Sequence, residues 1–200
     1  MKKIFFCFLL LTNMLFAQNL EDKYTTAVDL YVDGKFEEAL IMFKKFENTE
    51  KHNLNKILYF EGQTLFELNR KKESLKIFDK NIKLFPKSLI SYLGKAEFYL
   101  YSENYNKAIE YFSKAIQIDD KHATALYERG ECYFNTDQYS LAIKDYTSAI
   151  NLDNNNAQYY LSRSICYTLM QDNDKACIDY NEAIELKPSI SETYQLDDCK

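Results

Sequence analysis

The chain has 200 residues, of which 25 are Lys or Arg and 30 are Asp or Glu, and its formal net charge at pH 7 is −5. This acidic balance provides no basic surface, so nucleic acid is not an expected partner. Only 4 Gly and 2 Pro occur, which leaves little room for β-turns and favours an all-helical chain.

The first 17 residues have the pattern of a secretory signal peptide, in which two lysines precede an apolar run and a small residue follows it. The run covers residues 4–16, and Ala17 offers a cleavage site before Gln18. A retained membrane anchor is the alternative, but a spanning helix needs roughly 20 apolar residues, and Thr12 and Asn13 interrupt this shorter run. We therefore expect export to the periplasm or the cell exterior, with membrane contact only through this segment before cleavage.

After the signal-like segment, small and aromatic residues recur with a period of 34. Ala108, Ala142 and Ala176 are one such set. The same spacing relates Ala115 to Ala149 and Ala183, Phe112 to Tyr146 and Tyr180, and Tyr99 to Tyr133 and Tyr167. Within one period the apolar residues fall at helical spacing, so each period is expected to form a pair of short helices.

This pattern resembles the tetratricopeptide repeat, a helix pair that recurs every 34 residues. One repeat carries the motif at Tyr92, Ala96, Tyr99, Ala108, Phe112 and Ala115, and the next carries it at Leu126, Gly130, Tyr133, Ala142, Tyr146 and Ala149. The resemblance implies an all-α, right-handed solenoid of about five helix-turn-helix repeats, because one helix pair cannot bury its apolar face alone.

The expected array covers residues 18–190. Its repeats are assigned to residues 20–53, 55–88, 89–122, 123–156 and 157–190. The first is degenerate, as terminal repeats often are, since one of its faces has no neighbour. Residues 191–200 form a C-terminal stub, which we expect to leave the last surface of the array partly open.

The sequence contains no constellation typical of catalysis or metal binding. His52 and His122 fall in loops between repeats, and neither has a Cys or a second His at metal-ligand spacing. The run at residues 153–156 lacks the alternating ligands, central Gly and closing Glu of a calcium loop. Because no nucleophile, acid or base converges, we expect no enzyme activity, cofactor, metal or small-molecule substrate.

Four cysteines follow the expected cleavage site. Cys132 and Cys166 share one repeat position, where a small buried residue is expected, and Cys177 replaces an isoleucine of other repeats. Cys199 lies in the tail. An exported chain allows disulfides, but their connectivity cannot be read from sequence; a bridge from Cys166 to Cys177 across one helix pair is one possibility.

A charged pair recurs in two consecutive repeats. Arg129 and Asp145 are 16 residues apart, and so are Arg163 and Asp179. We expect each pair to join the first helix of its repeat to the second. Its role would be structural, because a partly buried Arg needs its carboxylate.

In the family that the sequence resembles, the first helices of the repeats line a concave face, and ligands usually bind there. Transferring those positions gives Tyr59, Gln63, Phe66 and Glu67 in the second repeat, Leu93, Glu97, Leu100 and Tyr101 in the third, Tyr127, Glu131, Phe134 and Asn135 in the fourth, and Leu161, Ile165 and Leu169 in the fifth. The alternative, that such residues pack between repeats, stays open for Tyr59 and Leu161. Glu97 and Glu131 are expected to be exposed, since an unpaired buried carboxylate is costly.

The lining of this face is aromatic and aliphatic, with a few acids. Well-known family members that clamp acidic peptide tails use Lys and Asn there, and that ligand class is not expected here. An extended segment or amphipathic helix with apolar anchors and a positive charge fits better. The expected function is therefore non-catalytic binding of a protein or peptide partner in the cell envelope or outside the cell. The alternative is an accessory subunit of an envelope enzyme or assembly complex.

Overall fold

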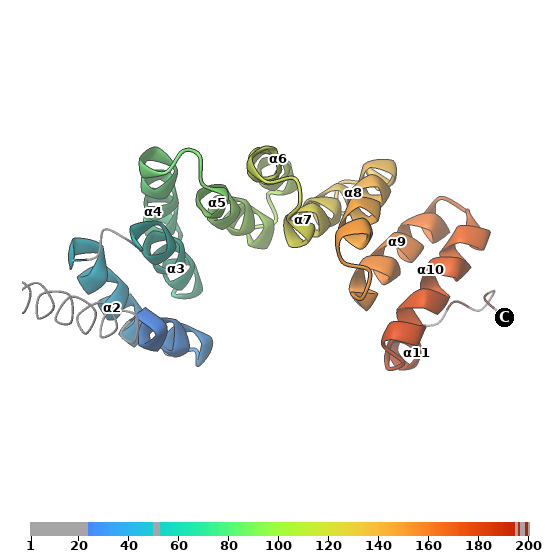
Figure 1. The fold of residues 1–200 in the computed structure, drawn as a ribbon, viewed down its shortest axis with the longest axis horizontal. Helices are drawn as coiled ribbons and strands as arrows, with labels where there is room; N and C mark the ends of the chain where they lie inside the picture. The colour runs from blue at the N-terminus through green and yellow to red at the C-terminus, as the bar shows by residue number, and fades with distance from the viewer. Residues whose placement is uncertain (1–23, 50–52, 195, 197–198, 200) are drawn as a thin grey trace, which may run out of the picture. The chain divides into compact units, whose positions relative to one another are not determined.

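The computed structural model describes residues 24–49, 53–194, 196 and 199, and all regular secondary structure within these ranges is helical (Figure 1). This confirms the expected all-α class. The chain divides into two compact units, Met1–Pro86 (unit 1) and Lys87–Lys200 (unit 2). The signal-like segment and His52 lie outside the described residues. Within those residues, no helix has the length and apolarity needed to cross a membrane.

Unit 1 contains two helix pairs. The first pair is a helix over residues 24–32 followed by α2 (Phe36–Thr49), and the second is α3 (Leu54–Glu67) followed by α4 (Lys71–Leu84). Helix α3 packs against both α2 and α4. The first pair is buried around Ala27, Ala39, Phe43, Phe46 and Ile57, so the degenerate first repeat still forms a core.

Unit 2 contains three helix pairs and a final single turn. The pairs are α5 (Leu89–Tyr101) with α6 (Tyr105–Ile118), α7 (Ala123–Phe134) with α8 (Tyr139–Leu152), and α9 (Ala157–Leu169) with α10 (Asn173–Leu186); α11 (Ile190–Thr193) follows. Each helix from α5 to α10 packs against the next along the chain, and α7 also contacts α9. The helix pairs of this unit are therefore stacked, as the period of 34 predicted.

The small residues of the repeat lie where the two helices of a pair approach each other. Ala108, Ala142 and Ala176 are all buried. A Cβ atom added to Gly130 would lie 2.6 Å from the ring of Tyr146. No side chain fits at that distance, so the close approach of α7 and α8 requires glycine at this position.

The turn inside each pair repeats as faithfully as the helices do. Asn69, Glu103, Asp137 and Gln171 are spaced by 34 residues, and all have a positive φ between 57° and 63°. The left-handed residue lets the chain reverse after the first helix, and in the third repeat the amide of Asn104 then donates to the Tyr99 carbonyl at 2.8 Å. In these four repeats a residue other than glycine takes the left-handed conformation, whereas in the first pair Gly34 does so with a φ of 74°.

The C-terminal stub differs from expectation in two ways. It covers the last repeat instead of leaving it partly open, since Tyr194 and Leu196 pack against the cluster around Tyr180. A disulfide between Cys166 and Cys177 was one possibility, and that possibility is wrong, because Cys177 is bonded to Cys199. Cys166 is a free buried thiol, as is Cys132, so the expectation that these two are compact core residues is confirmed.

Candidate interaction face

One side of the first helices in unit 2 carries the residues singled out from the sequence. We call it the first-helix face. It consists of Leu93, Glu97, Leu100 and Tyr101 on α5, Tyr127, Glu131 and Phe134 on α7 with Asn135 directly after that helix, and Leu161, Ile165 and Leu169 on α9. Residues at these three- and four-residue intervals share one side of a helix, and equivalent residues repeat every 34 positions.

The face is open at the C-terminal ends of the helices. Two large side chains there are in contact with solvent: Tyr101 is 61% exposed and Leu169 is 51% exposed. Asn135, at the equivalent position of α7, is also exposed. Large apolar side chains at the surface of a soluble chain mark candidate contact sites when they share one face.

Other members of the face are partly or wholly buried. Leu93 is only 8% exposed and belongs to the core around Phe112, so its assignment to an open surface is wrong. Leu161 is half-buried and packs against the cluster of Ala183 and Tyr180. It is therefore at least in part a packing residue, which was one of the two possibilities left open for it. Half-buried side chains still present part of their area to a partner.

Tyr127 joins neighbouring repeats. Its ring centroid lies 5.0 Å from that of Tyr159 on α9 and 5.7 Å from that of Tyr146 on α8. Burial, followed by the charge of Glu131, raises the pKa of Tyr127 to about 12, while hydrogen bonding to Ser162 acts in the opposite direction. Tyr127 is therefore a neutral hydrogen-bonding group that stabilises the stack as well as lining the face.

Glu131 is half-buried rather than exposed, because a core residue uses it as an acceptor. The Tyr146 hydroxyl donates to Glu131 Oε1 at 2.5 Å. Burial and the nearby Glu131 carboxylate raise the pKa of Tyr146, which keeps the phenol protonated as a donor. One Glu131 oxygen is thus held in a fixed direction, a feature that the sequence spacing did not reveal.

Glu128 is a further acid on α7 that the sequence reasoning missed. It is half-buried, and none of the hydrogen bonds or ion pairs found in the described residues involves it. Burial raises its pKa to about 7. Its distance of three residues from Glu131 and seven from Asn135 places it on the same side of α7, and that spacing could have identified it.

The candidate residues of the second repeat lie on α3 in unit 1. Gln63 is buried, and its Nε2 donates to the Tyr59 hydroxyl at 3.3 Å, so its assignment to an open face is wrong and Tyr59 is partly a packing residue. Phe66 is half-buried with Lys71 Nζ 5.5 Å from its ring centroid, and Glu67 is exposed. Of the four candidate residues on α3, Glu67 alone is exposed.

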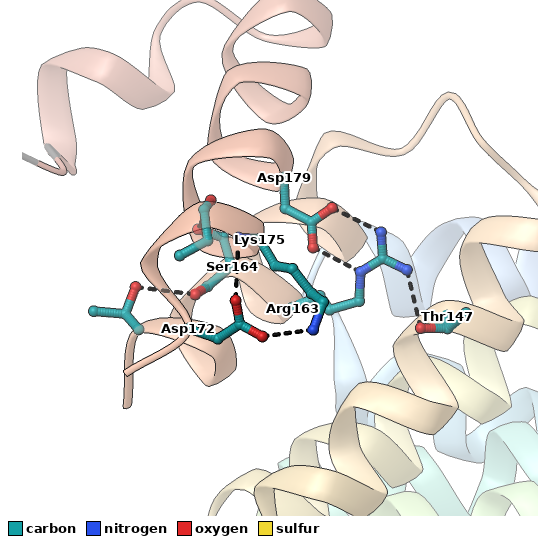
Figure 2. A network of polar contacts seen from close by, with 8 residues as sticks. Thr147, Arg163, Ser164, Asp172, Lys175 and Asp179 are labelled. Atoms are coloured by element: carbon teal, nitrogen blue, oxygen red, sulfur yellow. Dashed lines mark hydrogen bonds and ion pairs between the residues drawn. The ribbon is translucent and has the colours of Figure 1, made fainter. Parts of the chain in front are cut away.

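The paired charges lie between the helices, as predicted. Figure 2 shows the guanidinium of Arg163 with Asp179 on one side and Thr147 on the other. Arg163 Nε and Nη2 donate to the two Asp179 oxygens at 2.6 and 2.7 Å, and Nη1 donates to Thr147 Oγ1 at 2.9 Å. Because Thr147 lies on α8, the arginine joins its own repeat to the preceding one.

The same arrangement occurs one repeat earlier. Arg129 donates to both oxygens of Asp145 at 2.7 Å and to Ser113 Oγ on α6 at 3.1 Å. In the third repeat, Lys95 is buried with its Nζ 4.6 Å from the Tyr111 ring centroid, so a cation–π contact replaces the ion pair. The positive charges of Lys95, Arg129 and Arg163 thus have partners inside the stack. The hydroxyl acceptors Ser113 and Thr147 were not predicted from the sequence, although these two residues are 34 positions apart.

No metal-binding arrangement is found in the part of the chain that the structure describes, where no three His, Cys, Asp or Glu side chains come together. His122 has a structural role instead of being a simple loop residue. Its Nδ1 accepts a hydrogen bond from the amide of Ala125 at 3.1 Å and so caps α7.

Comparison with known proteins agrees with this geometry. Sequence models of the Tetratricopeptide repeat match residues 89–122, 123–156 and 157–190, which are the three helix pairs of unit 2. A search among curated proteins finds no match.

Solved structures share the fold. A fragment of MamA from Desulfovibrio magneticus RS-1 has a TM-score of 0.70 at 24% identity, covering 84% of this chain and 95% of its own. TTC0263, a thermophilic TPR protein of Thermus thermophilus, has a TM-score of 0.67 at 18% identity, covering 86% of this chain and 93% of its own. At these identities the likeness concerns the fold.

Proposed function

The chain belongs to the tetratricopeptide repeat family of protein–protein interaction modules, and from this premise we propose that the first-helix face of unit 2 binds a protein segment. The segment would be an extended strand or an amphipathic helix. It would carry apolar anchors and at least one Lys or Arg.

The observation that carries this proposal is the combination of exposed apolar side chains with unbalanced acids on one face. Tyr101 and Leu169 supply exposed apolar area, Glu131 supplies a carboxylate, and Glu128, whose pKa is raised to about 7, supplies a second one when it ionises. No Lys or Arg is among the residues of the face. The arginines of the same helices are engaged with Asp145 and Asp179 and so cannot neutralise these acids. A partner cation would do so, which is charge complementarity of the kind that selects partners.

Peptides selected from a random library on the immobilised chain are expected to combine aromatic or aliphatic anchors with Lys or Arg. Tyr101→Ala should weaken their binding by roughly tenfold or more through faster dissociation, because exposed aromatic residues often dominate such contacts. Glu131→Gln keeps an acceptor for Tyr146 but removes the charge, and should mainly slow association and reduce its salt dependence. Surface plasmon resonance at two salt concentrations measures both rates.

Ile178→Ala is the matched control, since Ile178 is 68% exposed but lies on the second helix α10. This change should leave binding unaltered. Selection of acidic peptides, or loss of binding in Ile178→Ala with retention in Tyr101→Ala, would exclude the first-helix face as the binding site.

We also propose that the protein is exported and acts in the periplasm or outside the cell. Two independent features support this. The first 17 residues have the pattern of a secretory signal peptide. Cys177 and Cys199 form a disulfide, a bond that persists in oxidising compartments and is rare in the cytosol.

N-terminal sequencing of the protein purified from its native cell fraction should therefore begin near Gln18. Cleavage after Ala17 fits the small residue that signal peptidases require. Recovery of the protein from the cytoplasm with Met1 in place would refute export and leave the binding proposal unaffected.

A further inference from the structure

The outer face of the last helix pair is covered by the chain's own C-terminus. Ala157, Tyr180, Ala183 and Ile190 form a buried cluster there. Such a face is where the next repeat would stack in a longer array, because each repeat buries its apolar side against a neighbour. Here a single turn, α11, takes that place together with Tyr194, Leu196 and Cys199.

The covering segment is defined by Ile190, Tyr194, Leu196 and Cys199, and we call it the C-terminal cap. Ile190 is buried, and the other three side chains pack on the cluster as half-buried groups. The hydroxyl of Tyr180 donates to the Tyr194 carbonyl at 2.9 Å, and the two rings meet edge to face with centroids 6.0 Å apart. These contacts determine where the cap lies on α10.

The cap is short, and its one regular element is the four-residue turn α11. Three local backbone hydrogen bonds of its described residues run from the Ile190 amide to the Lys187 carbonyl, from the Tyr194 amide to the Ile190 carbonyl and from the Cys199 amide to the Leu196 carbonyl. A segment this short, packed on one side of a helix pair, opens more readily than the helices beneath it. The additional constraint is the disulfide between Cys199 and Cys177 on α10, which closes a sequence separation of 22 residues.

We propose that the C-terminal cap is a redox-dependent cover: the Cys177–Cys199 disulfide keeps it on the last helix pair, and reduction releases it and exposes the stacking face beneath. In the release step, a dithiol reductant breaks the S–S bond. Its two thiols supply two electrons and two protons, leaving Cys177 and Cys199 as thiols and the reductant as a disulfide. Both cysteines are half-buried rather than fully enclosed, so a reductant can approach them.

The two other cysteines among the described residues are poorly suited to interfere by thiol exchange. Cys132 and Cys166 are buried. Burial raises the pKa of each thiol to about 12, assisted by the charges of Glu128 and Glu131 at Cys132 and of Glu131 at Cys166, so neither forms the nucleophilic thiolate at neutral pH. The redox response is therefore confined to the Cys177–Cys199 pair.

The connectivity is tested first, on the protein purified without reductant and treated with a thiol-blocking reagent. Digestion after Lys, Arg and Glu separates all four cysteines, because Arg163, Lys175 and Glu182 each lie between two successive cysteines. Mass spectrometry should find the Cys177 peptide linked to the Cys199 peptide, with Cys132 and Cys166 blocked as free thiols. Any other linkage, or blocked Cys177 and Cys199, would overturn the proposal.

Release is then measured by hydrogen exchange of the oxidised protein and of the same protein reduced with dithiothreitol. The Tyr194 and Cys199 amides should exchange faster after reduction by roughly a hundredfold, the order of the constraint that a disulfide closing such a loop supplies. Amides of α5 to α8 should be unchanged. Equal exchange of the cap in the two states would show that the disulfide does not control it.

A variant carrying Cys177→Ser and Cys199→Ser provides the matched control. It should show the fast exchange of the reduced cap with or without dithiothreitol, while far-UV circular dichroism remains that of the wild type. A slow-exchanging cap in this variant would overturn the proposal. Because these readouts concern the cap alone, they are independent of peptide binding to the first-helix face.

Discussion

Replacing Arg129 by methionine is expected to lower the free energy of unfolding by about 3–5 kcal/mol. The Asp145 side chain is 4% exposed and loses both of its short hydrogen bonds to the guanidinium, so a charge stays buried without compensation. The change also removes the bond from Arg129 to Ser113 that joins two repeats. A denaturant titration followed by circular dichroism measures the loss.

The double variant Arg129→Met with Asp145→Leu is expected to recover much of that stability. Two apolar side chains of similar volume leave no unpaired charge between α7 and α8, and the desolvation cost of the pair disappears. Simple additivity of the two single changes would show that the two residues are not coupled.

Lys175→Met is the control for charge removal without burial. Lys175 pairs with Asp172 at 2.5 Å, but the two side chains are 59% and 36% exposed, against 4% for Asp145. An exposed pair contributes about 0–1 kcal/mol, so this variant should resemble the wild type. The same titration run on both variants therefore separates the effect of burial from the effect of losing one positive charge.

The fold was predictable because its determinants are local and periodic. The 34-residue spacing of small and aromatic side chains specifies where two helices touch, and Ala142 and Tyr146 are buried as that spacing predicted. The pairing of Arg129 with Asp145 could be inferred for the same reason, since an identical spacing links Arg163 to Asp179. A contact that recurs in consecutive repeats leaves a periodic pattern in the sequence.

Features that occur once leave no such trace. Cys199 follows the last full repeat and has no equivalent in the other repeats. The 34-residue period therefore gave no indication that Cys177 bonds to Cys199 and not to Cys166. The first-helix face was predicted as a set of positions, but the burial of the side chains differs from one position to another. Leu93 is in the core while Tyr101, on the same helix, is largely exposed. Exposure depends on the neighbouring helix, which the residue's own sequence position does not specify.

Glu61 of unit 1 is another feature that occurs once, and it makes stability depend on pH. It lies on α3, is 1% exposed, and its Oε2 has no hydrogen-bond partner among the described residues. The charged groups around it are Glu47 and Lys44 on α2 and Lys80 on α4, and Lys80 forms an ion pair with Glu47. Burial first, and then the charge and hydrogen bonding of Glu47, raise the pKa of Glu61 from 4.5 to about 7.

A carboxyl whose pKa is higher in the folded state contributes stability that is fully present below pH 4.5. That contribution is lost as the pH rises through about 7, because the folded protein must then ionise a buried group. The difference between the two pKa values corresponds to about 3 kcal/mol. The wild type is therefore expected to lose about this much unfolding free energy between pH 5 and pH 8 relative to Glu61→Gln.

Denaturant titrations across this pH range measure the prediction. Glutamine has the shape of the protonated acid and can still donate to Glu47. The Glu61→Gln variant should therefore fold, but without a group that ionises at position 61. Glu67→Gln, on the exposed side of the same helix, is the matched control and should keep the wild-type fall in stability. If wild type and Glu61→Gln instead follow parallel curves from pH 5 to pH 8, Glu61 is ionised throughout, and its buried oxygen must have a compensating partner when the protein is in solution.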